Sequence, residues 1–245
     1  MSYNSAIEWT ESTWNPTTGC TKISEGCNNC YAERMSRRLK AMGQNNYRNG
    51  FKLTPHDSAL EIPLLWKKPQ LIFVDSMSDL FHEDVPVEFI YKVFKTMHKA
   101  DWHIFQILTK RPERLAKLDK TLKWSDNIWM GVTVENNDYI NRINVLKNIS
   151  SKIKFISFEP LLGPIKFNKY DRIDWIIVGG ESGPGARKIE KDWVIDIRNN
   201  CIENRIPFFF KQWGGFAKKK NGYMLDRKIW REMPSAFHEF VNRDP

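Results

Sequence analysis

The sequence predicts an α/β fold, a partial (β/α) barrel of about six or seven mostly parallel strands followed by a small C-terminal β-ribbon. Short apolar runs alternate with amphipathic segments, which is typical of βα units and a parallel sheet. The apolar runs number about seven, too few to close an eight-stranded barrel. We expect one domain over residues 1–245, in which residues 216–245 form the ribbon extension.

The first predicted elements surround a cysteine-rich loop. Residues 7–10 are predicted to form a short strand, and residues 12–16 a turn. Residues 31–42 are predicted to form a helix, because their apolar side chains recur at helical spacing and a glycine follows. Residues 44–70 are punctuated by prolines and are predicted to be irregular.

The rest of the chain repeats the alternation of strand and helix. The expected strands are residues 71–74, 104–108, 128–132, 153–157, 175–178 and 207–210. The expected helices are residues 86–100, 112–118, 138–149 and 191–204. Asn221-Gly222 is a strong hairpin signal, so residues 217–230 are predicted to form the β-ribbon around it.

Length and composition restrict the class of protein. With 245 residues, 41% of them hydrophobic, the chain is long enough to bury a core. No apolar run approaches the roughly 20 residues that cross a bilayer, and the N-terminus lacks the features of a secretory signal. We therefore expect a cytoplasmic protein with no membrane partner. The net charge of +9 is compatible with a polyanionic partner and equally with a lysine-rich solvated surface.

Three of the four cysteines lie in one loop, Cys20, Cys27 and Cys30, spaced Cys-x6-Cys-x2-Cys. Thiolates are soft ligands that suit iron–sulfur clusters, zinc or Cu(I), and in a reducing compartment such clusters usually indicate metal binding or catalysis. Zinc sites and cubane clusters usually take four protein ligands, so three cysteines indicate a centre with one open position. A [4Fe–4S] cluster whose fourth iron binds a small molecule fits this shortage.

Two other interpretations of the cysteines stay open. They could be three of four structural zinc ligands, with His56 or His82 as the fourth. They could also be ordinary buried thiols. The spacing argues against chance clustering, because the remaining cysteine, Cys201, is far along the chain.

Polar residues follow the expected strands, at the edge where parallel barrels carry their active sites. They are Asp75, Ser76, Asp79, Thr109, Lys110, Thr133, Glu135, Glu159, Glu181, Ser182, Lys211 and Gln212. Some of them could instead cap the following helices. The three glutamates each follow an apolar strand and need cationic partners, for which Lys110, Arg111 and Lys211 are available. The glycine-rich residues 179–185 are expected to press against a small molecule.

Seven sequence stretches carry a family resemblance. The cysteine loop resembles that of the radical S-adenosylmethionine enzymes. The whole chain is similar to a phage-associated family of unassigned function with a three-cysteine motif. The matching stretches are residues 14–20, 26–32, 76–82, 108–112, 131–135, 157–161 and 179–183.

The resemblance implies a [4Fe–4S] cluster on the three cysteines and a bound S-adenosylmethionine. The residues expected to contact the cofactor are Asp75, Ser76, Asp79, Thr133, Glu135, Gly179, Gly180 and Glu181. Those expected to act in catalysis are Glu159, Lys110 and His82. The implied function is reductive cleavage of S-adenosylmethionine to a 5′-deoxyadenosyl radical, with an external electron donor and an unidentified substrate.

Nucleic acid is one candidate for that substrate. Arg34, Arg37 and Arg38 are predicted to share a basic helix face, and residues 218–220 could form a second basic wall. Trp213 and Trp230 could stack bases. The alternative function is a zinc-stabilised basic nucleic-acid-binding protein without catalysis.

Overall fold

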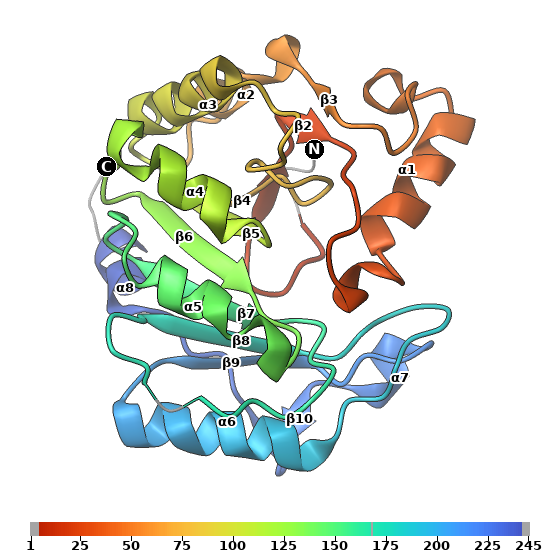
Figure 1. Ribbon diagram of the computed structural model, residues 1–245, viewed down its shortest axis with the longest axis vertical. Helices are drawn as coiled ribbons and strands as arrows, with labels where there is room; N and C mark the ends of the chain where they lie inside the picture. The colour runs from red at the N-terminus through yellow and green to blue at the C-terminus, as the bar shows by residue number, and fades with distance from the viewer. Residues whose placement is uncertain (1–4, 168, 242–245) are drawn as a thin grey trace.

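Seven parallel strands curl into a half-barrel in the computed structural model, which describes residues 5–167 and 169–241 (Figure 1). The strand order is β1-β4-β5-β6-β7-β8-β9, and every neighbouring pair is parallel. The strands are β1 (Ser12–Trp14), β4 (Leu71–Val74), β5 (Ile104–Thr109), β6 (Ile128–Thr133), β7 (Lys154–Phe158), β8 (Trp175–Gly179) and β9 (Phe208–Gln212). The predicted partial barrel is confirmed.

Helices cover the convex face of the sheet, because alternate strand residues point outward and are apolar. Ile72, Phe105, Met130, Ile156 and Phe208 are all buried in this outer layer. Figure 1 shows the helices following the arc of the sheet from the top of the view to the bottom. They are α3 (Val87–Lys99), α4 (Pro112–Leu118), α5 (Asn141–Leu146) and α6 (Lys191–Asn204).

The concave face is filled by aromatic side chains. Trp9 packs against Phe73, Phe155 and Trp175, with ring centroids 4.6, 6.2 and 6.2 Å apart. Helix α8 (Ser235–Val241) packs apolar residues against the same cluster. The N-terminal end of the half-barrel is therefore solid, and only its carboxyl end is lined by polar residues.

The first strand is β1, so the prediction of a strand at residues 7–10 and a turn at 12–16 was wrong. Pairing with β4 explains the difference, since Ser12, Thr13 and Trp14 align with Ile72, Phe73 and Val74. Trp14 is fully buried and donates its indole N–H to the Ala59 carbonyl at 2.8 Å. Residues 7–10 turn instead, which directs Trp9 into the concave face.

The cysteine-bearing segment runs from β1 to β4. Helix α1 (Tyr31–Ala41) confirms the predicted helix, and it lies apart from the outer arc of helices, on the right of Figure 1. Residues 44–70 are more ordered than predicted, and β2 pairs antiparallel with β3. The short elements between β1 and β4 are β2 (Thr17–Thr18), η1 (Glu25–Cys27), η2 (Asn45–Tyr47), β3 (Thr54–Pro55), η3 (Asp57–Ala59) and α2 (Ile62–Leu65). Two further 3-10 turns are η4 (Asp119–Thr121) and η5 (Asn137–Tyr139).

A small antiparallel ribbon follows β9, as predicted, but its turn is elsewhere. Strands β10 (Met224–Leu225) and β11 (Lys228–Ile229) are joined by Asp226 and Arg227, both left-handed, with φ of 51° and 62°. Asn221 ends the short helix α7 (Lys218–Asn221) instead of forming the turn. Ion pairs from Lys191 and Arg198 of α6 to Asp226 hold the turn where it is.

The predicted C-terminal extension is described up to residue 241, and residues 242–245 lie outside the described residues. In the part of the chain that is described, no helix has both the length and the apolarity to span a membrane.

Candidate active site at the carboxyl ends of the strands

Strand register brings five charged side chains to the inner side of the half-barrel mouth. Lys110, Glu135, Glu159, Glu181 and Lys211 continue the alternation of residues that face the concave core. Glu159 accepts a hydrogen bond from the Lys211 ammonium at 2.7 Å, and Lys110 Nζ is 3.9 Å from Glu135 Oε1. The expectation that strand-end carboxylates find cations at the same rim is confirmed for these two pairs.

Two further cations were missed by the sequence analysis. Arg142 of α5 donates to fully buried Glu135 at 2.8 Å. Arg187 donates from Nε and Nη2 to the two oxygens of Glu181, at 3.0 and 2.7 Å. These hydrogen bonds, with one from Asn29, hold the pKa of Glu181 below its ordinary value although burial alone would raise it. The sequence offered one signal for these two arginines, namely that a buried carboxylate needs a cationic partner.

Arg111 clamps the cysteine loop to the sheet. Its guanidinium is only 4% exposed and donates to Asp79 Oδ2 at 3.1 Å and to Glu83 Oε2 at 2.8 Å. From the same group, Nη2 donates to the Thr21 carbonyl at 3.1 Å, and Nη1 donates to Cys20 Sγ at 3.5 Å. Because all five guanidinium N–H groups sit in a rigid fork, one arginine fixes the loop, β5 and the turn after β4 together.

Asp79 is the anionic centre of this clamp. Besides Arg111, it accepts hydrogen bonds from the Thr109 hydroxyl at 2.7 Å, the Lys110 amide at 3.1 Å and the Phe81 amide at 3.0 Å. Its predicted contact with a cofactor stays a prediction, and it would require an exchange of these internal partners.

His82 supports the loop from beneath. It is 2% exposed, accepts from the Asp84 amide at Nδ1, and lies 2.8 Å from the Thr21 hydroxyl at Nε2. Because Nδ1 accepts, the proton lies on Nε2, which donates to Thr21. Burial, together with the nearby charge of Arg111, lowers the pKa of His82 and keeps the ring neutral. Both ring nitrogens thus have hydrogen-bond partners within the protein. The predicted catalytic role of His82 stays a prediction.

The three thiols lie in different electrostatic surroundings. Burial, and then the charge of Asp79, raise the pKa of Cys20 to about 11. Burial alone would raise the pKa of Cys27, but Lys110 and hydrogen bonds from the loop lower it overall. All three cysteines of the loop, including Cys30, are free and half-buried, whereas Cys201 is fully buried in the outer core.

Asp75 is engaged by the segment that leads into the cysteine loop. It accepts from the Thr17 amide and hydroxyl, both at 2.9 Å, and burial raises its pKa to about 8. Next to it, Ser76 donates to Asn15 at 3.1 Å and its carbonyl accepts from the Tyr31 hydroxyl. The Tyr31 ring is 48% exposed, but its hydroxyl end is enclosed, and burial raises the pKa of that group.

Gly26 lets the cysteine loop rest directly on β6. A Cβ at this position would lie 2.5 Å from both Cγ and Oε1 of Glu135. Ser24 also donates to Glu135. The Glu135 carboxylate therefore binds both the cysteine loop and Arg142. Thr133 is buried at the end of β6, and its carbonyl accepts from Arg142 at 2.8 Å.

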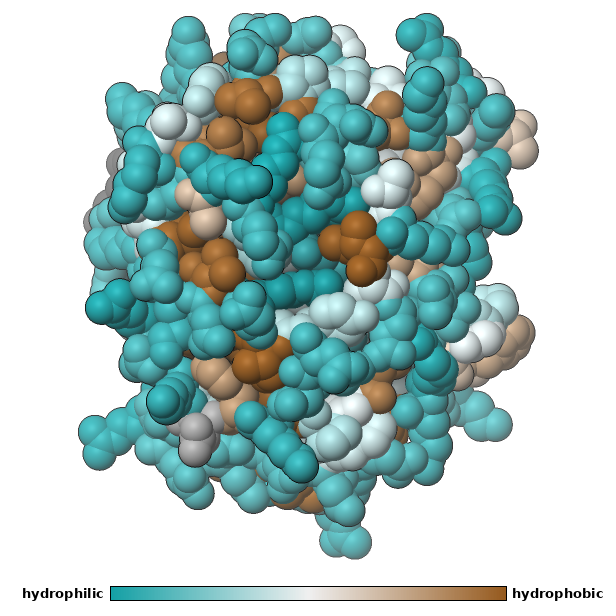
Figure 2. Space-filling model, viewed as in Figure 1, coloured by the Kyte–Doolittle hydropathy of each residue, from teal (hydrophilic) through white to brown (hydrophobic). Residues whose placement is uncertain are grey.

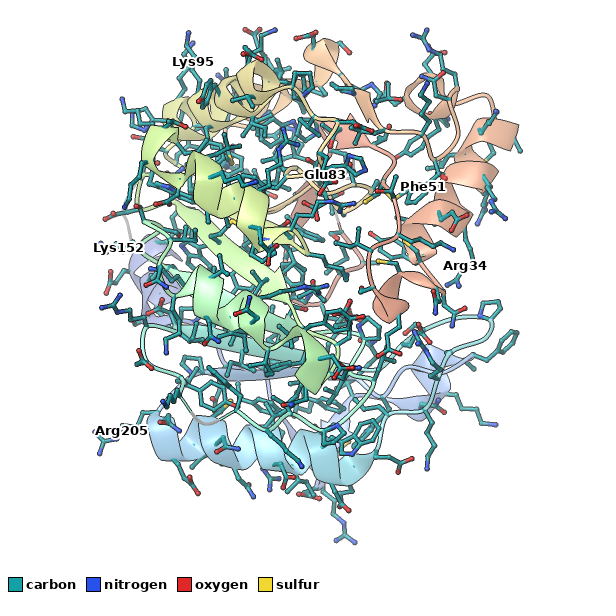
Figure 3. The ribbon with its side chains drawn as sticks, viewed as in Figure 1. Arg34, Phe51, Glu83, Lys95, Lys152 and Arg205 are labelled. Atoms are coloured by element: carbon teal, nitrogen blue, oxygen red, sulfur yellow. The ribbon has the colours of Figure 1, made fainter. Side chains whose placement is uncertain are left out.

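The glycine-rich loop after β8 docks against the cysteine loop and α1. Asn29 donates to Glu181 at 3.0 Å and to the Gly185 carbonyl at 2.8 Å. Arg34 donates to the carbonyls of Asn29 and Ser182, both at 3.0 Å, and lies near the end of α1 in Figure 3. These contacts fix the loop against the cysteine loop and α1, and its predicted contact with a small molecule stays a prediction.

Gly179 and Gly180 also permit close packing. A Cβ on Gly179 would lie 3.2 Å from Glu159 Cδ, and one on Gly180 would lie 2.2 Å from the Trp213 carbonyl oxygen. Gln212 donates to the Gly180 carbonyl at 2.9 Å. Their predicted contact with a cofactor stays a prediction.

Several side chains of the predicted nucleic-acid surface have partners within the protein. Arg34 is committed to two carbonyls, and Arg37 pairs with Glu33 at 2.6 Å, so the predicted basic face is partly used internally. Trp213 packs on Phe210 with centroids 4.7 Å apart, and Trp230 lies under Lys228 and packs on Phe208. The side chains of residues 218 and 219 lie outside the described residues.

The three cysteines of the loop are the candidate metal ligands. Across the described residues, no three His, Cys, Asp or Glu side chains converge closely enough to hold one metal ion. Cys20, Cys27 and Cys30 are free and half-buried, with Arg111 next to Cys20 and Lys110 near Cys27. Their predicted binding of a cluster stays a prediction.

One comparison with known proteins finds a matching family. The model of a family described as protein of unknown function (DUF5131) matches residues 4–234, nearly the whole chain. No curated protein and no solved structure matches the chain.

Proposed function

The chain belongs to the DUF5131 family of proteins of unknown function, and from its site we propose that it is an iron–sulfur enzyme of the radical S-adenosylmethionine type. One observation carries the proposal. Three free, half-buried thiols occupy the loop after the first strand of a half-barrel, at the edge where parallel barrels carry their active sites. The likeness to phage-associated three-cysteine proteins belongs to the same proposal and rests on the sequence motifs alone.

A [4Fe–4S] cluster bound to Cys20, Cys27 and Cys30 would supply the electron that cleaves S-adenosylmethionine reductively to a 5′-deoxyadenosyl radical. The chain's own contribution is to hold three thiolates in one place. Arg111 donates toward Cys20 and offsets part of the rise in its pKa that burial and Asp79 cause, and Lys110 helps to lower the pKa of Cys27.

The floor of the site is closely packed. The concave face below the mouth is filled by aromatic and aliphatic side chains, among them Phe73, Phe155 and Trp175. A packed floor of this kind would limit the access of solvent to reactive groups in the mouth.

Groups for substrate and cofactor line the mouth above this floor. Glu159 and Lys211 form a 2.7 Å pair with side chains 21% and 12% exposed, so the pair can hold or move one proton between its oxygen and nitrogen. Lys110, 22% exposed, is available to an anionic group. Asp75, with its raised pKa of about 8, holds its proton at neutral pH and can donate a hydrogen bond.

Anaerobic purification tests the proposal. The expected product is a coloured protein with about four iron and four sulfide per chain, which produces 5′-deoxyadenosine from S-adenosylmethionine when dithionite is supplied. The triple variant C20A/C27A/C30A should lose both the iron and the product, whereas C201A should retain the cluster because Cys201 lies in the outer core. A colourless wild-type protein without iron would rule the proposal out.

The alternative, a zinc-stabilised nucleic-acid-binding protein, is not favoured by a specific contact. His56 Nε2 lies 2.8 Å from the Thr18 hydroxyl, and His82 Nε2 lies 2.8 Å from the Thr21 hydroxyl. Either histidine would have to leave that partner to complete a zinc site. The same metal analysis decides between the two functions, because stoichiometric zinc without sulfide would identify the alternative.

A further inference from the structure

A charged cavity lies outside the mouth, between the cysteine loop and α4. Its volume is about 390 Å³, within the range of small-molecule sites. Ile23 lines it on the side of the cysteine loop, and its charged lining consists of Glu83, Lys110, Arg111, Glu113, Arg114 and Lys117. Glu83 is labelled near the centre of Figure 3, and the same region of Figure 2 is mostly hydrophilic.

The cations of this cavity differ in how far they are neutralised. Arg111 is fully committed to Asp79, Glu83 and the cysteine loop. Lys110 has only a distant pairing, 3.9 Å from Glu135. In the described residues, neither Arg114 nor Lys117 has a carboxylate within ion-pair distance.

One nitrogen of the Arg114 guanidinium has no hydrogen-bond partner among the described residues. Its Nη2 donates to the Val85 carbonyl at 2.5 Å, whereas its Nη1 is buried and has no hydrogen-bond partner within the described part of the chain. A buried donor on a charged group is costly to leave unpaired. That nitrogen is buried beneath the cavity surface, so Arg114 contributes its positive charge to the cavity rather than a free donor. Glu83 pairs with Arg111, and Glu113 is the other carboxylate of the lining, which leaves an excess of positive charge from Lys110, Arg114 and Lys117.

We propose that this cavity binds the phosphate group of a nucleotide, either free or within a nucleic-acid strand. A phosphate brings up to two negative charges and several acceptor oxygens, which match the excess positive charge of Lys110, Arg114 and Lys117 in this lining. The volume of the cavity also accommodates more than an isolated ion.

The position of the cavity connects it with the cysteine loop. Arg111 lines the cavity and also donates to Cys20 and Thr21, and Ile23 belongs to the loop itself. A phosphate held here would anchor the rest of its molecule beside the mouth. The binding step needs no cluster, so the inference does not depend on the proposed function.

Binding to the full-length purified protein tests the inference. Two probes are used at low salt, fluorescent adenosine triphosphate and a labelled single-stranded DNA of about a dozen bases, each followed by anisotropy and competed with pyrophosphate. The variant R114Q/K117Q removes both uncommitted cations. It is expected to weaken binding about tenfold or more, because charge-assisted hydrogen bonds are lost.

The matched control is K95Q/K99Q on α3. Both lysines are exposed and lie outside the cavity lining, and the control lowers the net charge by the same amount. It should change affinity less than about twofold, since only the diffuse field of the protein is altered. Circular dichroism and thermal unfolding verify that both variants fold.

The two probes identify the source of the phosphate. Tight, pyrophosphate-sensitive binding of adenosine triphosphate indicates a free nucleotide, and binding of the DNA alone indicates a strand. Each supports the inference if R114Q/K117Q weakens it about tenfold or more, and each counts against the inference if R114Q/K117Q binds like the wild type. The inference is overturned if neither probe binds the wild type, or if the control variant loses as much affinity as R114Q/K117Q. Loss of the cluster in C20A/C27A/C30A should leave this binding intact.

Discussion

Asp75 shows how a single residue is determined by its surroundings. It is 3% exposed, adopts a left-handed backbone with φ of 57°, and accepts two hydrogen bonds from Thr17. Asp and Asn tolerate this backbone region better than most residues other than glycine. No cation among the described residues pairs with its carboxylate, and burial therefore raises its pKa to about 8.

The raised pKa predicts a pH-dependent stability. Between about pH 4 and pH 8 the folded chain keeps the Asp75 proton that the unfolded chain has lost, so this group lowers the free energy of unfolding as pH rises through that window. Above about pH 8 its effect is constant. The isosteric variant Asp75→Asn removes the titration and keeps the left-handed backbone and an acceptor oxygen.

Urea unfolding from about pH 5 to about pH 9 measures this effect. The stability of Asp75→Asn relative to wild type should rise steadily and level off near pH 8. Parallel stability profiles for the two proteins across this range would show that the Asp75 carboxyl is not held in its protonated form.

At the scale of elements, the cysteine loop is held by charged side chains in addition to a small apolar cluster, in which Cys30 packs against Ala32, Tyr47 and Met77. Arg111 fastens it to β5 and to the turn after β4, and Arg187 fastens it to the loop after β8 through the Glu25 carbonyl at 2.9 Å. Glu135 holds it through Ser24. With these attachments the three thiols of the loop remain half-buried.

Replacing Arg111 by Gln should destabilise the loop and the fold together. The change leaves Asp79 buried without its cation, and breaking a buried pair in this way costs roughly 3–5 kcal/mol. The double variant R111Q/D79N should regain part of that loss, because the uncompensated charge is gone. Urea unfolding gives both values.

Arg37→Gln serves as the control for the loss of an arginine. Arg37 pairs with Glu33 but is 75% exposed, so its removal should cost less than about 1 kcal/mol. If R111Q and Arg37→Gln proved equally stable, the clamp would be dispensable for folding.

At the scale of the whole molecule, a half-barrel leaves a concave face that must be covered. Seven strands cannot close on themselves, and here Trp9 and helix α8 supply the missing apolar contacts. This packing closes the N-terminal end and leaves the carboxyl end polar. The two ends of the half-barrel thus differ, because apolar side chains fill one and charged side chains lie at the other.

Trp9→Ala tests whether the N-terminal segment is part of the fold. Trp9 is 4% exposed and in contact with Phe73, Phe155 and Trp175, so its truncation should cost roughly 3–5 kcal/mol in urea unfolding. Phe216→Ala is the control, because Phe216 is 81% exposed and should change stability by less than about 0.5 kcal/mol. Equal stability of the two variants would mean that the concave face holds together without Trp9.

The sequence by itself determined the seven-stranded α/β architecture. The period of apolar residues is a local property, so the last six strands of the seven-stranded sheet and the helices Pro112–Leu118 and Lys191–Asn204 were predicted within a residue or two. The same patterning placed Glu135, Glu159 and Glu181 at one edge of the sheet, because parallel strands end together.

Only the tertiary structure decided how the N-terminal segment folds and which partner each buried charge takes. Residues 7–10 are strand-like in composition, yet the unfilled concave face draws Trp9 inward. Arg187 reaches the cysteine loop as well as Glu181, a contact between segments about 160 residues apart. Such pairings depend on strand register and loop packing across the whole molecule, and no local pattern encodes them.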